Sequence, residues 1–322
     1  MDDARGRSVS SKRYLITGGT GFLGRHIVRR LAKRGWRLRI ATRRPNEALQ
    51  LKTNGVPGQI ELVQANIRDD KSVAAAVHDA DAVINAVGIL FESGKQKFAA
   101  VQAQGAARIA RLAAEAGVET MVHISAIGAD ETSQALYAQS KAAGEQAVCE
   151  AVPQAHILRP SIVIGPEDDF FNRFGAMAML APALPLVGGG TTRYQPVSVF
   201  DVAAAVEACL DGAAPDIYEL GGPDIYSFKQ LMELLLAEIG RDRLLLPLPF
   251  FAARFIAALT QFAPLLGFKP LLTPDQVTLL KSDNVVGDGV AGFAELNITP
   301  QPIAALLPDY LARYRPGGKK GA

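Results

Sequence analysis

The chain has 322 residues, of which 49% are hydrophobic, so it is long enough for one large or two modest domains with buried cores. Its 34 lysines and arginines nearly balance its 32 acids, and the formal charge of +2 gives no electrostatic case for a nucleic-acid partner. The cysteines, Cys149 and Cys209, form neither a disulfide framework nor a zinc pattern, so we expect free, buried thiols in a cytoplasmic protein.

The start of the chain and one apolar stretch bear on targeting. Residues 1–13 mix acids and bases and lack the apolar core of a secretion signal. The stretch 244–268 carries a single charge, Arg254, but prolines interrupt it, and its longest uninterrupted piece is shorter than the ~20 residues that cross a bilayer. We expect no transmembrane span, and flexible termini at 1–10 and 315–322.

The first half of the chain alternates short apolar runs with longer helical segments. Such alternation favours parallel strands with helices on both faces, so we predict an α/β fold with a Rossmann-type, doubly wound parallel sheet. Strands are predicted at 14–17, 37–42, 60–65, 81–87, 120–125 and 156–160, and helices at 21–34, 72–78, 98–116 and 137–150.

After Pro160 the spacing becomes irregular. We predict a nucleotide-binding domain over 11–160, to which 193–222 returns, and a smaller, discontinuous substrate or lid domain over 161–192 and 223–314. Within the second domain, Phe170, Phe171 and Phe174 either wall an apolar pocket or pack as core.

A glycine-rich turn follows the first predicted strand and opens a helix. Gly18, Gly21 and Gly24 lie in "TGGTGFLGRHIV", where glycine permits a tight turn and the helix N-terminus supplies amides to a pyrophosphate. An ordinary tight turn is the alternative, but the strand-turn-helix context favours a dinucleotide site. Thr20, Phe22 and Leu23 belong to the same predicted site.

Two arginines follow the second strand, where an NAD-binding domain usually has an acid. Arg43 lies nineteen residues beyond Gly24, close to the usual separation of the ribose-reading position. Arg43 and Arg44 can bond a 2′-phosphate, so we predict NADP(H) in preference to NAD(H). A solvated basic turn is the alternative.

Further cofactor contacts are expected where later strands end. Asn66 and Ile67 are placed at the adenine edge, although they could be a mere strand ending. Ala86 and Gly88, with Val87 between them, are placed under the adenosine ribose, or they too are a mere strand ending. Ser161, just after the sixth strand, is one more candidate for cofactor binding.

A candidate catalytic group lies around the fifth strand. Tyr137 and Lys141 are four residues apart on a predicted helix and share one face. The ammonium would favour the ionised phenol for acid-base work, and Ser125, twelve residues before Tyr137, could polarise a carbonyl. A helix-surface pair is the alternative. The four histidines show no metal-ligand spacing, so we expect them at the surface or at strand ends and predict no metal site.

Together these residues resemble the extended short-chain dehydrogenase/reductase superfamily. More narrowly, "GGTGFLGRHIV", "NAVGILFESG", "HISAIGAD", "YAQSKAAGE", "LRPSIVIGPEDDFFNRF", "QPVSVFDVA", "YELGGP" and "SDNVV" are similar to its atypical branch. That branch contains the nucleotide-binding accessory subunit of respiratory complex I and its bacterial relatives. The resemblance implies tightly held NADPH with a structural or regulatory role, and association with complex I subunits at the inner face of the inner membrane.

The sequence departs from this branch in both directions. It keeps Tyr137, Lys141 and Ser125, which many members have lost, but it has Gln102 where the superfamily often has asparagine. Two hypotheses therefore stay open. One is a nucleotide-binding accessory protein of complex I. The other is an active NADP(H)-dependent oxidoreductase, epimerase or dehydratase on a small apolar substrate, of quinone or isoprenoid type.

The apolar segment 250–263 can be read in two ways. On a helix, Phe251, Phe255, Leu259 and Phe262 form one stripe. Such a stripe suits either an interfacial helix, at a membrane or a complex, or a helix packed over the substrate cleft.

Overall fold

The computed structural model describes residues 11–260, 270 and 272–317. The expected flexible segment 1–10, most of 315–322, and Phe262 lie outside these described residues. The chain divides into two compact units, and each is described here by itself. The first comprises Met1–Arg159, Val202–Glu219 and Val290–Ile298, and the second comprises Pro160–Asp201, Leu220–Gly289 and Thr299–Ala322.

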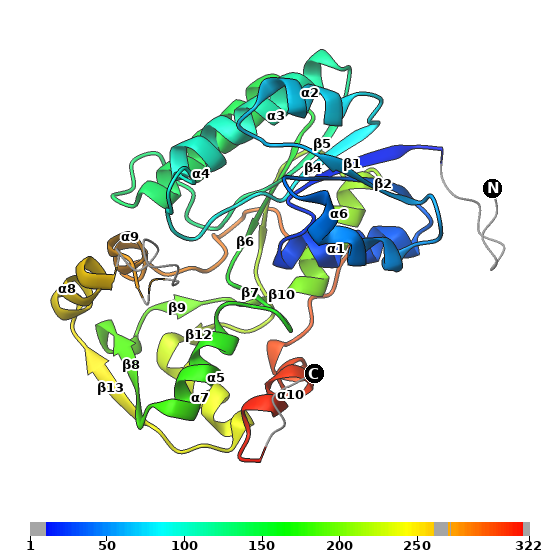
Figure 1. Cartoon of the computed structure of the whole chain (residues 1–322). Coiled ribbons are helices and arrows are strands. Elements are labelled where there is room, and N and C mark those ends of the chain that lie inside the picture. Colours follow the sequence, from blue (N-terminus) through cyan, green and yellow to red (C-terminus); the bar gives the residue numbers. More distant parts are fainter. Residues whose placement is uncertain (1–10, 261–269, 271, 318–322) are drawn as a thin grey trace. The chain divides into compact units, whose positions relative to one another are not determined.

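A seven-stranded parallel sheet forms the centre of the first unit. Its order is β11-β6-β5-β4-β1-β2-β3, so the chain starts in the middle and winds outward in both directions (Figure 1). This confirms the predicted doubly wound α/β fold. The strands are β1 (Arg13–Thr17), β2 (Arg37–Thr42), β3 (Ile60–Gln64), β4 (Ala82–Asn85), β5 (Thr120–Ile124), β6 (His156–Pro160) and β11 (Ile217–Leu220).

Helices cover both faces of this sheet. Figure 1 shows α2 (Asp70–Val77), α3 (Gln104–Glu115) and α4 (Leu136–Ala151) over one face, and α1 (Phe22–Lys33) and α6 (Val199–Leu210) over the other. Successive strand residues point to opposite faces, so every strand needs apolar side chains at consecutive positions. Leu15 packs in the core with α2 and α3, and its neighbour Ile16 is equally buried.

Helix α6 brings a distant part of the chain back to α1. Arg30 pairs with Glu207, and Arg34 reaches Glu207 at 3.2 Å and Asp211 at 3.0 Å. Residues 290–298 lie beside the next strand, β11, because the Glu219 amide donates to the Ala291 carbonyl at 2.8 Å. The first unit therefore takes three separate pieces of chain.

The returning piece, Val202–Glu219, is shorter than the range 193–222 expected from the sequence. The residues before it are held in the second unit, because β9 (Arg193–Tyr194) pairs with β12 (Tyr226–Ser227) and Arg193 forms an ion pair with Asp283 at 2.8 Å. The Val197 amide also donates to the Ile162 carbonyl.

The second unit is built from short two-stranded sheets and helices. β8 (Ala183–Val187) pairs in parallel with β13 (Leu244–Leu248), and β7 (Val163–Ile164) pairs in parallel with β10 (Val197–Ser198). Its helices are α5 (Phe171–Leu180), α7 (Phe228–Ile239), α8 (Phe250–Thr260), α9 (Pro274–Leu279) and α10 (Leu307–Leu311). None of the helices among residues 11–260 and 272–317 is both long enough and apolar enough to cross a membrane.

Aromatic side chains fill the core of the second unit. Phe171 is fully buried, and Phe170 contacts the rings of Phe171, Phe174 and Phe228 edge to face at centroid distances of 5.1 to 6.0 Å. These contacts favour the core reading of the three phenylalanines over the pocket reading.

Two smaller expectations were wrong. Cys209 is buried as expected, but Cys149 is exposed near the end of α4. Among the histidines, His26 lies inside α1 and is 3% exposed, so it is neither a surface residue nor a strand-end residue. Both errors concern the face of a helix that turns inward, which neighbouring elements decide.

A buried carboxylate accepts hydrogen bonds from distant parts of the second unit. Asp168 is 3% exposed and accepts hydrogen bonds from the Tyr310 hydroxyl at 2.6 Å and from the amides of Gly165 and Asn172. Burial raises the pKa of Asp168, and these donors act in the opposite direction.

We expect Tyr310→Phe to lower the free energy of unfolding by about 2 kcal/mol, because it leaves the Asp168 carboxylate with one donor fewer in a buried place. Urea unfolding measures this loss. Tyr226→Phe is the control, since its hydroxyl bonds the exposed Asp224 and should contribute about 0.5 kcal/mol or less. Equal losses in the two variants would contradict the assignment.

Candidate functional site

The carboxyl ends of the central strands lie level with one another. Thr17 at the end of β1 pairs with Asn85 at the end of β4, and Asn85 pairs with His123 near the end of β5. The loops that leave these strands therefore begin at one edge of the sheet, where ligands of doubly wound folds bind. The predicted glycine turn, Gly88 and Ser125 all follow these strand ends.

Close backbone contacts shape the glycine turn. Gly18 has a φ of +76°, and a Cβ on it would lie 2.6 Å from the carbonyl oxygen of Ala86. A Cβ on Gly24 would lie 2.1 Å from the carbonyl oxygen of Gly18. No side chain fits at either position, so the turn, the start of α1 and the end of β4 pack backbone against backbone.

The helix that follows this turn begins without a side-chain cap. Gly21 is the N-cap of α1 and offers no polar side chain, and the first turn of the helix holds no acid. Its amides and the positive end of the helix dipole are therefore suited to an anion. Thr20 is exposed, and Phe22 and Leu23 are half-buried in the same turn. This cradle fits the pyrophosphate of a dinucleotide.

The two arginines after β2 have different partners. With the Gln96 amide turned so that its oxygen accepts, Arg43 donates to it from both terminal nitrogens, at 2.8 and 3.2 Å. Arg44 instead pairs with Glu47 at 3.1 Å, on the exposed surface. Arg43 therefore reaches a second loop, whereas Arg44 matches the solvated basic turn.

The loop that contains Gln96 is held by another arginine. Arg68 donates to the Lys95 carbonyl at 2.9 Å, and its amide donates to the Asn66 side-chain oxygen at 3.2 Å. Asn66 thus shapes a local turn, and Ile67 packs against the core of the first unit. The sequence pattern singled out neither Gln96 nor Arg68, because their contacts join loops far apart in the chain.

The end of β4 connects the nucleotide turn to the predicted catalytic group. The Ala86 amide donates to the Thr17 carbonyl at 3.0 Å, and the Val87 amide donates to the Asn85 side-chain oxygen at 3.2 Å. A Cβ on Gly88 would lie 3.6 Å from the Lys141 ammonium nitrogen. Lys141 is therefore a neighbour of the residue predicted to lie under the ribose.

Lys141 also reaches the end of β5, where Ser125 follows. Lys141 is 4% exposed and donates to the carbonyl of Ile124, the residue before Ser125, at 3.0 Å. The Ser125 hydroxyl is enclosed and has no hydrogen-bond partner among the described residues. Tyr137 lies one turn before Lys141 on α4, and its ring contacts Phe98 edge to face. The structure thus brings Ser125 and Lys141 together, with Tyr137 on the same helix.

Burial controls the charges of this group. It lowers the pKa of Lys141 to about 8, although the nearby Glu145 carboxylate acts in the opposite direction. Burial and then the Lys141 charge lower the pKa of His123 to about 3, so His123 is neutral near pH 7. Its Nδ1 lies 3.0 Å from the Asn85 amide nitrogen, and Asn85 accepts from Thr17 at 2.8 Å. In the sequence, this row corresponds to the polar residues Thr17, Asn85 and His123 on three buried strands.

Gln102 contacts the turn of α4 that holds Tyr137 from a π-helical segment, Ala99–Ala103. Its amide nitrogen donates to the Ser140 hydroxyl at 3.3 Å, and Ser140 donates to the Tyr137 carbonyl at 2.8 Å. The Gln102 side-chain oxygen is buried and has no partner among the described residues. Segments of π-helix are frequent at functional sites, where they shift the register of a helix.

Ser161 belongs to the second compact unit. Its hydroxyl lies 2.9 Å from the Asn284 carbonyl oxygen and 2.7 Å from the Asn284 side-chain oxygen. Within that unit Ser161 ties the start of the β7 region to 284. Its role toward a cofactor stays a prediction.

Comparisons with known proteins agree with this geometry. The sequence profile of the NAD dependent epimerase/dehydratase family matches residues 14–221. An Arabidopsis thaliana protein, the mitochondrial NADH dehydrogenase (ubiquinone) 1 alpha subcomplex subunit 9, is 35% identical over 97% of this chain and 80% of its own length. A ceramide reductase of Caulobacter vibrioides is 32% identical over 73% of each chain.

A solved structure supports the fold. The dTDP-glucose 4,6-dehydratase of Streptomyces venezuelae, with NAD and TYD bound, superposes with a TM-score of 0.68 over 94% of this chain and 96% of its own. Its sequence identity is 22%, so the likeness extends to the fold alone.

We expect Lys141→Met to raise the free energy of unfolding of the nucleotide-free protein by about 2 kcal/mol at pH 7, because it removes a charge that burial disfavours. A lysine with a lowered pKa in the folded state destabilises the fold below about pH 8. This cost disappears as the pH rises toward the ordinary lysine pKa near 10.5. The advantage of the variant should therefore shrink between pH 8 and pH 10.

Urea unfolding at pH 7 and pH 10 measures this difference, with the exposed Lys71→Met as the control. An advantage of Lys141→Met that is the same at both pH values would contradict the explanation.

Proposed function

The chain belongs to the NAD dependent epimerase/dehydratase family, and from this premise we propose that it is an NADP(H)-holding accessory protein of respiratory complex I. Its homology to a complex I subunit over nearly its whole length supports the complex I part. The observation that carries the nucleotide part is the side-chain-free cradle of Gly18, Gly21 and Gly24 at the uncapped start of α1. The protein would lie at the membrane surface beside its partner subunits.

In this proposal the cofactor is chosen by Arg43. Its guanidinium is planar and can bond a phosphate through two nitrogens, as it does the Gln96 oxygen. The loop with Gln96 is further held by Arg68 through the Lys95 carbonyl, so the guanidinium is positioned before a ligand binds. Arg44 contributes less, because Glu47 already neutralises it.

The nucleotide would be structural in this role. Its pyrophosphate would bind the α1 amides, and its adenosine half would join the loops after β2, β3 and β4. Lys141, whose ammonium donates to the Ile124 carbonyl, would also bond the nicotinamide ribose. Binding to the folded state alone stabilises a protein by mass action, so bound nucleotide would hold the first unit together.

A second candidate is an active oxidoreductase, epimerase or dehydratase on a small apolar substrate of quinone, isoprenoid or other lipid type. The observation that favours it is the enclosed Ser125 hydroxyl, which has no partner among the described residues and follows Ile124, whose carbonyl binds the buried Lys141 ammonium. The bound nicotinamide would supply a hydride. Tyr137 would move the proton, Lys141 would favour its ionised form, and Ser125 would polarise the substrate carbonyl. The relationship to a ceramide reductase agrees with an apolar substrate.

Arg43→Gln should weaken NADPH binding by about tenfold or more and leave NADH binding nearly unchanged, because it removes charged hydrogen bonds to the 2′-phosphate alone. Arg44→Gln is the matched control and should cost about threefold or less, since Arg44 already pairs with Glu47. Calorimetric titration of the nucleotide-free protein with both cofactors measures these affinities. Equal losses for NADPH and NADH would refute the selective role of Arg43.

Tyr137→Phe separates the two candidate functions. If the nucleotide is structural, the variant should keep its bound NADPH, its association with complex I subunits and the NADH-quinone activity of the membranes. Native mass spectrometry of the purified protein and its partners reads out the first two. Loss of cellular function in a variant that still folds and binds NADPH would instead support the active enzyme, and failure of the native protein to co-purify with any respiratory subunit would remove the accessory role.

A further inference from the structure

Helix α8 exposes its largest apolar side chains. Phe251, Phe255 and Leu259 are 79%, 67% and 63% exposed. They are four residues apart and form one stripe, while Ala253 and Ala257 on the opposite side are fully buried. A surface helix ordinarily turns its large apolar residues inward. This helix does the reverse, and the described residues of the second unit leave the stripe exposed.

The side of α8 opposite the stripe is packed against the second unit. Ala253 and Ala257 pack in a small core with Val187 and Val277, and their short side chains let α8 lie close to it. The last residue of α8, Thr260, bonds the Leu272 carbonyl at 2.8 Å. Helix α9 then starts with a capping box at Thr273 and Gln276. The exposed stripe is thus part of a packed element.

The strand before α8 carries exposed leucines as well. Leu244 and Leu246 are 67% and 52% exposed on β13. Alternate residues of a strand share a face, so they lie on the same side as Leu248, which packs against the core beneath α8. The second unit thus presents apolar side chains from two consecutive elements.

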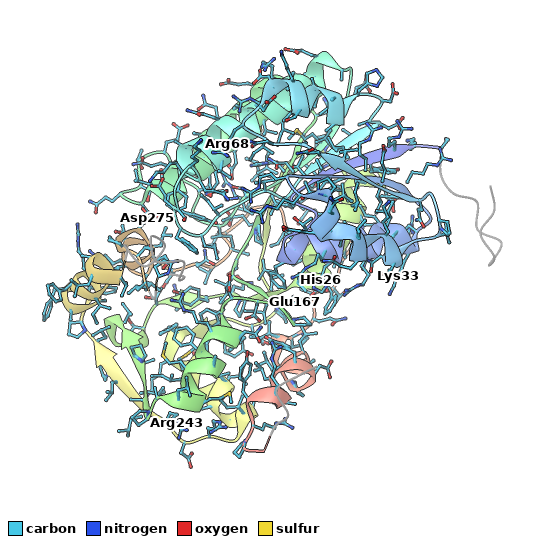
Figure 2. All side chains as sticks on the ribbon, viewed as in Figure 1. His26, Lys33, Arg68, Glu167, Arg243 and Asp275 are labelled. Carbon is cyan, nitrogen blue, oxygen red and sulfur yellow. The ribbon has the colours of Figure 1, made fainter. Side chains whose placement is uncertain are left out.

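A basic hollow adjoins the stripe. It measures about 230 Å³ and is lined by Phe250, Phe251, Arg254, Val277, Thr278 and Lys281. The Lys281 ammonium lies 5.8 Å from the centre of the Phe250 ring. Asp275, in the first turn of α9, is the one acid of α8 and α9 (Figure 2). Arg254 and Lys281 therefore give this edge of the stripe a positive character.

We propose that α8 docks on a bilayer that contains anionic phospholipids. Phe251, Phe255 and Leu259 enter the boundary between headgroups and acyl chains, and Arg254 and Lys281 bind lipid phosphates at the hollow. Exposed aromatic residues beside cations are the pattern of interfacial helices, which combine apolar burial with attraction to an anionic surface. The proposal adds a lipid contact to the proposed location at the membrane, and it does not depend on nucleotide binding.

The test uses the purified full-length chain and vesicles, with no respiratory subunit present. The protein should sediment with vesicles of phosphatidylcholine and phosphatidylglycerol, and more weakly with vesicles of phosphatidylcholine alone. Added salt should lower the first affinity toward the second, because it screens the attraction of Arg254 and Lys281 to the lipid.

Variants then separate the two contributions. Phe251→Ser with Phe255→Ser should weaken binding to both kinds of vesicle by about a hundredfold, at about tenfold for each ring removed from the interface. Arg254→Gln with Lys281→Gln should weaken binding to the anionic vesicles alone, by about fivefold for each charge. Leu49→Ser, at a 55% exposed leucine of the first unit, is the control and should bind as the native protein does.

The four replaced side chains are Phe251, Arg254 and Phe255 of α8 and Lys281 after α9. They are exposed or line an open hollow, so the variants should keep the native far-UV circular dichroism and melting temperature. The proposal is overturned if the native protein binds neither kind of vesicle, or if the phenylalanine variants bind as well as the Leu49 control. It is also overturned if Phe251 and Phe255 are needed to bind a respiratory subunit in detergent but the protein does not bind vesicles. Helix α8 would then dock on protein.

Discussion

The turn after β1 can lie against the end of β4 only because Gly18 has no side chain. Its carbonyl oxygen in turn lies where a side chain on Gly24 would have to be, so the start of α1 is fixed to the same point. Three backbone segments meet there without an intervening side chain. The close approach of α1 to the end of β4, with its first amides left open, depends on this contact. Backbone contacts thus shape the candidate site, and the charged side chains lie around it.

The Lys141 ammonium lowers the stability of the fold, but it places a charge in the candidate site before any ligand binds. An ammonium buried beside neutral His123 costs folding free energy, and one hydrogen bond to the Ile124 carbonyl offsets only part of that cost. Near this charge, His123 belongs to a row in which Thr17, Asn85 and His123 are hydrogen-bonded to one another and so are already oriented. Both candidate functions use the same arrangement, since a ribose hydroxyl and an ionised phenol are each stabilised by a nearby cation.

The sequence predicted the features that depend on local pattern. Alternating apolar runs and helices led to the parallel sheet, and glycine spacing led to the turn before α1. The roles of the site residues stay predictions, but their surroundings show what local pattern misses. Arg43 and Arg44 are adjacent in sequence, yet one reaches Gln96 and the other Glu47, because a loop beyond β4 lies near only the first. The burial of His26 and the start of the returning segment at Val202 likewise depend on contacts between distant elements.

The returning segment also sets the order in which the protein can be completed during synthesis. The acids that pair with Arg30 and Arg34 of α1 lie at Glu207 and Asp211, and the outer strand β11 and 290–298 come later still. When the first 160 residues have left the ribosome, the sheet still lacks its outer strand and α1 still lacks its ion-pair partners. Most of the second unit is translated before 290–298 arrives to complete the first. The nascent chain must therefore keep the unfinished edge at β6 from pairing with other chains until β11 has been translated, a period in which chaperones act.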